Sequence, residues 1–155
     1  MAPDEFAPAQ RYANLAGTRG ELAEWLRQQD EDELFRLLYP LAVSSQLECP
    51  AACGAAMFLA ELRPACPVSY REALLAALPA WDVGIREVPQ YLVAVFGRHR
   101  VLDVVRDLAR EPLPDAHISR LRQVGYHLRV PDSERLAWRG SPDAEPDGVL
   151  SRGAF

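Results

Sequence analysis

Prolines divide this chain into segments that are each about the length of a short helix. Between residues 50 and 131 they stand at the ends of apolar stretches, and proline is tolerated in the first turn of a helix but breaks its interior. Inside the stretches, apolar residues recur at helical spacing, as at Ile118, Leu121, Val124 and Leu128. No segment shows the sustained alternation of a strand. The pattern predicts an all-α fold.

Capping signals indicate where the helices begin and end. Thr18 with Glu21, and Ser69 with Glu72, have the spacing of a capping box, in which each side chain satisfies a backbone N–H of the other residue. The other signals are Asp30 and Asp115 as N-caps, Pro50 and Pro89 as first helical residues, Pro40 as a kink or break, and Gly97 as a left-handed C-cap. The predicted helices cover residues 19–29, 31–42, 51–62, 70–78, 89–96, 100–109, 116–128 and 133–138.

Short connections favour antiparallel packing of neighbouring helices, because a turn of two to six residues returns the chain alongside the preceding helix. The pair 51–62 and 70–78 is followed by the pair 89–96 and 100–109, offset by a little over 35 residues, close to the length of a helical-hairpin repeat. We therefore expect short antiparallel helical hairpins, stacked as a compact bundle or a short solenoid. Residues 1–139 are expected to form this single helical domain, and residues 140–155 a mobile acidic C-terminal tail.

The 17 basic residues are all arginine, and they are unevenly distributed in a chain of net charge −5. Residues 1–60 contain four arginines against nine acidic residues, whereas residues 98–139 contain nine arginines against six. This asymmetry predicts a polarised surface. The acidic total argues against general nucleic-acid binding, which requires a basic footprint. No apolar run approaches the roughly 20 residues that span a bilayer, so we expect no membrane contact.

The cysteines and histidines indicate neither a disulfide framework nor a metal site. The chain has an odd number of cysteines, which are Cys49, Cys53 and Cys66, so they cannot all pair in disulfides. The spacing of the first two does not match a zinc or thioredoxin motif. The three histidines share no ligand spacing, and there is no glycine-rich phosphate loop or nucleophile elbow. The first ten residues lack the basic segment of a secretory signal. We expect a cytoplasmic protein that uses no cofactor and is not an enzyme.

One series of helix start and end signals resembles that of a known class of proteins. Residues 81–92 read WDVGIREVPQYL, and Phe96 and Gly97 follow. A Trp-Asp turn, a Val-Pro helix start and a Phe-Gly helix end occur in this order in bacterial HEAT-like helical-repeat proteins. The resemblance covers about residues 50–130, where the repeats are few, and the N-terminal helices match none of them. It implies a scaffold that binds partners through a ridged surface, and it implies no catalytic residue.

Two polar clusters contain the candidate partner-binding residues. The first consists of Arg98, His99, Arg100 and Arg106, with Arg110 on the same helical face as Arg106. Several guanidinium groups in one place could hold a phosphate or an acidic partner segment. The competing interpretation is a solvated face on which neighbouring acids and arginines pair locally.

The second cluster consists of Asp82, Arg86, Glu87 and Tyr91, on a loop and the helix that follows it. Polar residues on a loop that rigid helices hold in place are candidates for binding. They also suit ordinary roles, Asp82 as a cap and Arg86 as a first-turn charge. Trp81, beside them, is expected to fill the gap between helix pairs.

These observations favour a protein–protein interaction module without catalysis that docks onto one partner protein, as a toxin-neutralising immunity protein or a small assembly adaptor does. The alternative is a ligand- or nucleic-acid-binding regulator that uses the Arg98–Arg110 face. The two hypotheses differ in their salt dependence, because phosphate binding weakens steeply with salt and an interface with apolar anchors does not.

Overall fold

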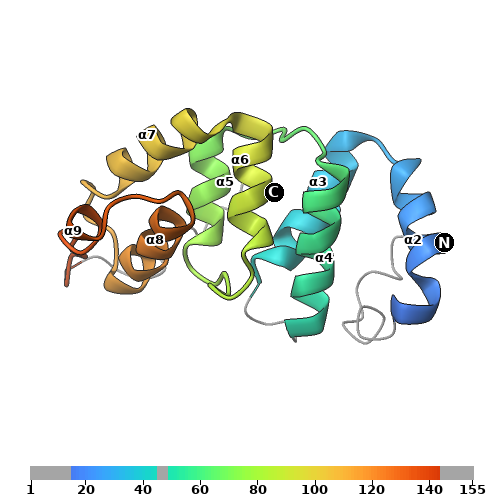
Figure 1. Ribbon diagram of the computed structural model, residues 1–155, viewed down its shortest axis with the longest axis horizontal. Helices are drawn as coiled ribbons and strands as arrows, with labels where there is room; N and C mark the ends of the chain where they lie inside the picture. The colour runs from blue at the N-terminus through green and yellow to red at the C-terminus, as the bar shows by residue number, and fades with distance from the viewer. Residues whose placement is uncertain (1–14, 45–48, 144–155) are drawn as a thin grey trace.

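The computed structural model describes residues 15–44 and 49–143, which fold into helices and their connections without a strand. Figure 1 shows an elongated molecule, with α2 at one end and α8 and α9 at the other. The prediction of an all-α bundle of packed helices is therefore confirmed for this part of the chain. The helices are α2 (Leu15–Arg27), α3 (Glu31–Ala42), α4 (Cys49–Leu62), α5 (Tyr70–Ala77), α6 (Glu87–Phe96), α7 (Arg98–Leu108), α8 (Asp115–His127) and α9 (Asp132–Arg135).

Helices that are close along the chain also lie next to one another in space. α4 packs against α3 and α6, and α6 also contacts α7 and α8. In Figure 1 the stack runs from α2 through α3 and α4 to α5 and α6, and then to α7, α8 and α9. Each short helix buries its apolar stripe against its neighbours, which produces this order.

Small residues allow the close packing of α4. Ala51, Ala52, Ala55 and Ala56 are all buried, and Phe58 on the same helix supplies bulk. Because an alanine side chain is a single methyl group, the backbones of the neighbouring helices can approach α4 closely.

An aromatic cluster occupies the core between α3 and α6. The rings of Phe35 and Tyr39 stack with their centroids 4.7 Å apart, and the Tyr91 ring lies 6.3 Å from each of them. The Tyr39 hydroxyl donates a hydrogen bond to the Ala73 carbonyl at 2.5 Å, and the Tyr91 hydroxyl donates one to the Pro64 carbonyl at 2.7 Å. These bonds compensate for the burial of two polar groups and join α3 and α6 to other parts of the chain.

Two local predictions are confirmed. The Ser69 hydroxyl accepts a hydrogen bond from the Glu72 N–H at 3.2 Å, and the Glu72 carboxylate accepts one from the Ser69 N–H at 2.9 Å, which completes the capping box. Trp81 is 1% exposed, and its indole N–H donates to the Ile85 carbonyl at 2.9 Å. It lies in the core, as expected.

Two predictions for α2 and α3 differ from the structure. α2 already includes Leu15, so Thr18 lies inside the helix and is not its N-cap. α3 ends at Ala42 as predicted and continues through Pro40, so of the predicted kink or break the break does not occur. Pro40 lies in the last turn, where its missing N–H removes one helical hydrogen bond, and the Val43 N–H still reaches the Tyr39 carbonyl at 3.1 Å.

A single residue separates α6 from α7. Gly97 ends α6 as predicted and has φ = +86°, but its ψ of 144° places it outside the predicted left-handed helical conformation. Because glycine redirects the chain in one step, α7 already begins at Arg98, two residues earlier than predicted. Asp115 is the first residue of α8 and not its N-cap, a position that Pro114 occupies.

The first residues of the predicted tail pack against the domain. A Cβ atom at Gly140 would lie 2.6 Å from the Asp115 Cα, so only glycine fits there without a shift. The Ser141 N–H donates to the Leu113 carbonyl at 2.8 Å. Residues 144–155 of the predicted tail lie outside the described residues.

Candidate functional site

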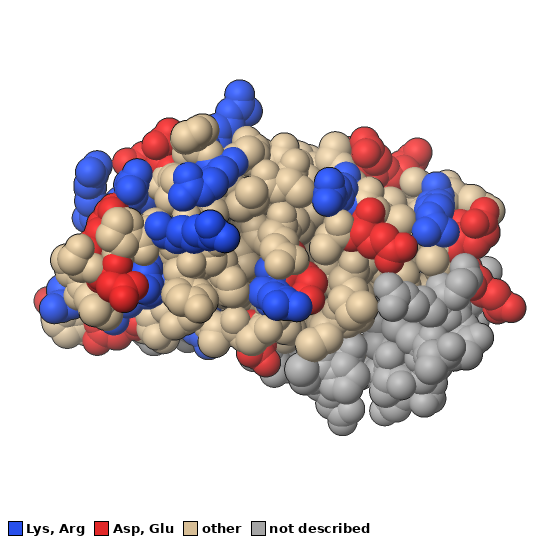
Figure 2. All heavy atoms as spheres, viewed as in Figure 1, with Lys and Arg blue, Asp and Glu red and all other residues tan. Residues whose placement is uncertain are grey.

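The surface is polarised, as the charge distribution predicts. Figure 2 shows arginines gathered over α7 and the helices beside it, and acidic residues gathered over α2 and α3. The partners of the individual arginines show which of these charges remain available.

Several arginines bind the carbonyl groups at the ends of helices. Arg120 donates from Nε to the Trp81 carbonyl at 3.0 Å and from Nη1 to the Leu78 carbonyl at 3.2 Å, just after α5. Arg98 donates from Nη2 to the Leu128 carbonyl at 2.7 Å, just after α8. The last carbonyls of a helix have no partner within it, and the forked guanidinium group is well suited to bind them. These arginines therefore hold the helices together.

Two residues of the predicted Arg98–Arg110 face are paired with acidic residues. Arg106 makes two hydrogen bonds to the Glu134 carboxylate, at 2.7 and 3.2 Å, and these bonds raise the pKa of Arg106 and lower that of Glu134. Arg110 lies 3.6 Å from the Asp107 carboxylate. The local-pairing interpretation accounts for Arg110, and Arg106 connects α7 to α9.

The other residues of that face lie in the first turn of α7, which begins two residues earlier than the predicted helix 100–109. Arg98 is exposed but bonded to Leu128, as described above. His99 and Arg100 are exposed. The structure thus brings the predicted residues onto one helix but leaves them with different partners.

The second predicted cluster does not form one surface. Tyr91 belongs to the aromatic core and is fully buried, so the structure removes it from the candidate contact residues. The Asp82 carboxylate accepts a hydrogen bond from the Gly84 N–H at 2.9 Å and orders its own loop. Arg86 is exposed.

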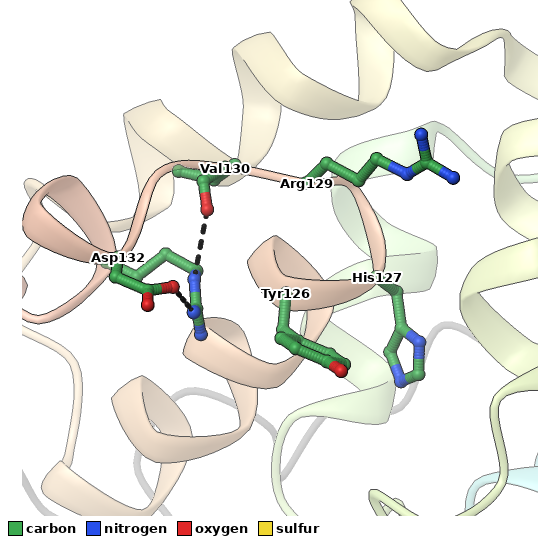
Figure 3. A pocket seen from close by; sticks show the side chains of 6 residues that line it. Tyr126, His127, Arg129, Val130 and Asp132 are labelled. Atoms are coloured by element: carbon green, nitrogen blue, oxygen red, sulfur yellow. Dashed lines mark hydrogen bonds and ion pairs between the residues drawn. The ribbon is translucent and has the colours of Figure 1, made fainter.

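A shallow hollow of about 480 Å³ lies where α8 ends and α9 begins. We call it the Tyr126 hollow. In Figure 3 the Tyr126 and His127 side chains lie side by side, and Arg129 points away from them. The lining residues are Tyr126, His127, Arg129, Val130, Asp132 and Arg135.

Tyr126 is 61% exposed, and its neighbours hold its ring in place. The Arg135 guanidinium carbon lies 5.3 Å from the ring centroid, within the range of a cation–π interaction. The His127 ring meets the Tyr126 ring edge to face at 5.7 Å. Arg135 is itself fixed by the Val130 carbonyl at 3.1 Å and by an ion pair with Asp132. Tyr126 is thus an exposed aromatic group with a defined orientation.

Arg129 has a backbone conformation that usually requires glycine. The φ of Arg129 is +60°. The Arg129 N–H donates to the Tyr126 carbonyl at 3.0 Å, and the Val130 N–H donates to the Gly125 carbonyl at 2.9 Å. This is the Schellman motif that ends a helix, with arginine at the position where glycine is most common. Strained backbone is found preferentially at functional sites. The exposed Arg129 side chain makes this position a candidate for binding.

His127 connects the hollow to the loop that precedes α6. Its ring lies 6.3 Å from the Trp81 ring, and the backbone of Val83 lies close enough to influence its pKa. Burial lowers the pKa of His127, and the charge of Arg86 lowers it further, although the Val83 backbone and the charge of Glu87 raise it. The loop and the end of α8 therefore form one continuous surface.

Exposed apolar groups concentrate at this end of the molecule. Leu136 is 60% exposed and Val83 is 41% exposed, in addition to Tyr126. In the part of the chain that the structure describes, Met57 on α4 is the one other large apolar residue with comparable exposure, at 41%. Sequence reasoning did not select Tyr126, Arg129 or Arg135. The available signal was that Tyr126 lies off the apolar stripe of its helix.

Further features of the described residues concern a metal site, a reactive thiol and a membrane-spanning helix. Among residues 15–44 and 49–143, no three His, Cys, Asp or Glu side chains come together as a metal site requires. Burial raises the pKa of the Cys66 thiol, which disfavours the reactive thiolate. No helix within the described ranges is long and apolar enough to cross a membrane.

The hollow is thus built around an oriented tyrosine and a strained arginine. Comparison with known proteins finds no protein-family model, no curated protein and no solved structure that matches this chain.

Proposed function

We propose that this protein is a protein–protein interaction module without catalysis, and that the Tyr126 hollow is its contact surface for one partner protein. The observation that carries the proposal is the exposed Tyr126 ring, held between Arg135 and His127. Tyrosine and arginine are enriched among the residues that dominate binding energy at interfaces. A side chain that is already oriented loses less entropy on binding.

The exposure of Val83 and Leu136 strengthens this choice of surface, because exposed apolar groups among charged residues are typical of a protein-binding site. The stacked helices are compatible with a bacterial HEAT-like repeat, which would place the hollow at the C-terminal end of the scaffold. An immunity protein or an assembly adaptor would use such a surface. We also propose that the protein is cytoplasmic.

The alternative of a phosphate- or nucleic-acid-binding face over Arg98–Arg110 loses support from the geometry. Arg106 is neutralised by Glu134, and Arg98 donates to a backbone carbonyl. A phosphate would have to compete with both interactions.

Photo-cross-linking tests the proposal. The cross-linking amino acid p-benzoylphenylalanine replaces Tyr126 in one variant and Met57 in a control variant, and both are irradiated in the native cell. Tyr126 and Met57 are both exposed, so both variants are expected to fold, which circular dichroism checks. We expect one discrete protein adduct from position 126 and none from position 57. Adducts of the same proteins from both positions, or none from position 126, would contradict the proposal.

A further inference from the structure

The start of α3 carries acidic side chains without an ion-pair partner among residues 15–44 and 49–143. Asp30, Glu31, Asp32 and Glu33 are all exposed, and none of these carboxylates forms an ion pair or accepts a side-chain hydrogen bond within the described residues. We call residues 30–33 the α3 acidic turn. The nearby Arg27 already interacts with Glu24 at 3.9 Å and with Glu61 at 3.4 Å. Arg36 follows one turn later, so the start of α3 keeps a surplus of negative charge.

The surroundings of the Tyr126 hollow have the opposite surplus. Arg86, Arg100 and Arg129 are exposed, and none of them forms an ion pair within the described residues. The bond from Arg98 to the Leu128 carbonyl places the first turn of α7, and Arg100 with it, beside the end of α8. Figure 2 shows the arginine-rich and acidic regions over opposite ends of the molecule.

The C-terminal end of the stack also exposes two large side chains that a further helix would cover. In stacked helical proteins the terminal unit normally presents a polar outer face, because no further unit buries it. Here the last unit instead exposes Tyr126 at 61% and Leu136 at 60%. Charge complementarity at the rim and apolar groups within it are the usual anatomy of a specific interface.

We infer that the partner of the Tyr126 hollow is a second copy of this chain, which docks its α3 acidic turn against the arginines around the hollow. The inference rests on the proposed function and names its partner. Because the two complementary surfaces lie at opposite ends of one chain, the contact is head-to-tail and leaves a free surface at each end of the assembly. Association is therefore expected to increase with concentration without stopping at a closed dimer. It is also expected to weaken with salt, which screens the exposed charges.

Sedimentation velocity of the full chain with two charge-reversal variants tests this inference. The first variant carries Glu31→Arg, Asp32→Arg and Glu33→Arg, and the second carries Arg86→Glu, Arg100→Glu and Arg129→Glu. All six positions are exposed, and circular dichroism verifies the fold of each variant. We expect wild type to associate, each variant alone to remain monomeric, and an equimolar mixture of the two to associate again. Restoration by mixing cannot arise from misfolding.

Salt supplies a second measurement. Raising the ionic strength from about 50 mM to about 500 mM is expected to weaken wild-type association at least about tenfold. A wild-type monomer at every concentration, a mixture that stays monomeric, or association that neither variant changes would overturn the inference. Cross-linking from Tyr126 to a different protein would overturn it too, while leaving the proposed function intact. The absence of any cross-link at Tyr126 would contradict both this inference and the proposed function.

Discussion

Replacing Arg129 by glycine is expected to make the protein more stable and a weaker binder. The left-handed conformation of Arg129, with φ = +60°, costs an L-amino acid roughly 1–2 kcal/mol and costs glycine nothing. Glycine loses more backbone entropy on folding, which offsets roughly 0.5–1 kcal/mol of that gain. The free energy of unfolding should therefore rise by about 0.5–1 kcal/mol, or about 1–4 °C in Tm for a chain of this size.

Urea unfolding followed by circular dichroism measures this change, and Arg63 supplies a matched control. Arg63 follows α4 with φ = +48°, far along the chain from the Tyr126 hollow. Arg63→Gly should give a similar gain in stability without affecting cross-linking at Tyr126. Arg129→Ala keeps the backbone strain and removes the side chain, so it should change stability by less than about 0.5 kcal/mol but still reduce partner capture.

The strain argument would be refuted by a loss of stability in Arg129→Gly beside a gain in Arg63→Gly. That result would mean that the Arg129 side chain stabilises the end of α8. An Arg129→Ala variant that captured the partner as well as wild type would show instead that this arginine has no part in binding.

Three further outcomes are expected. Tyr39→Phe removes the hydrogen bond to the Ala73 carbonyl and should lower the free energy of unfolding by about 1 kcal/mol in urea titrations; an unchanged midpoint would show that the bond adds nothing net. Gly140→Ala places a Cβ atom 2.6 Å from the Asp115 Cα and should lower the free energy of unfolding by about 1–3 kcal/mol. Thermal unfolding at the wild-type Tm would show that the segment around residue 140 can move away from Asp115 without loss of stability. His117 is 3% exposed, and its burial, followed by the charge of Arg120, lowers its pKa. The unfolded chain therefore takes up the proton first, so stability should be complete above about pH 7 and fall as the pH drops below about 6.5. Urea midpoints measured across this range should show a smaller decline in His117→Gln, and equal declines in both proteins would assign the effect to other groups.

Sequence signals for helix capping predicted the structure correctly where the two hydrogen-bonding residues lie within a few positions of each other. The Ser69 and Glu72 capping box formed as predicted, because its two hydrogen bonds depend only on the start of one helix. The equivalent signal at Thr18 failed, because the preceding residues are helical as well. Capping contributes only about 1 kcal/mol, so a longer helix can override it. Pro40 was likewise tolerated in the last turn of α3.

The candidate site was less accessible to sequence reasoning. Tyr91 suited a polar surface cluster in the sequence, but it entered the aromatic core, where its hydroxyl finds the Pro64 carbonyl. Tyr126 is not predicted as a contact residue from the sequence, because nothing in its neighbours along the chain shows that Arg135 will lie over its ring. Exposure depends on which helix covers a residue, and that helix is distant in the sequence.

The sequence by itself determined that this chain is helical and where most of its helices lie, because apolar spacing, prolines and caps act over single turns of backbone. It also determined that acidic and basic residues would be unevenly distributed. Only the tertiary structure decided which arginines remain available. Arg106 is neutralised by a carboxylate 28 residues away, and Arg120 binds a carbonyl 42 residues away. Those partners come within hydrogen-bonding distance only when the helices pack, and the same packing leaves Arg129 and Tyr126 exposed at the end of α8.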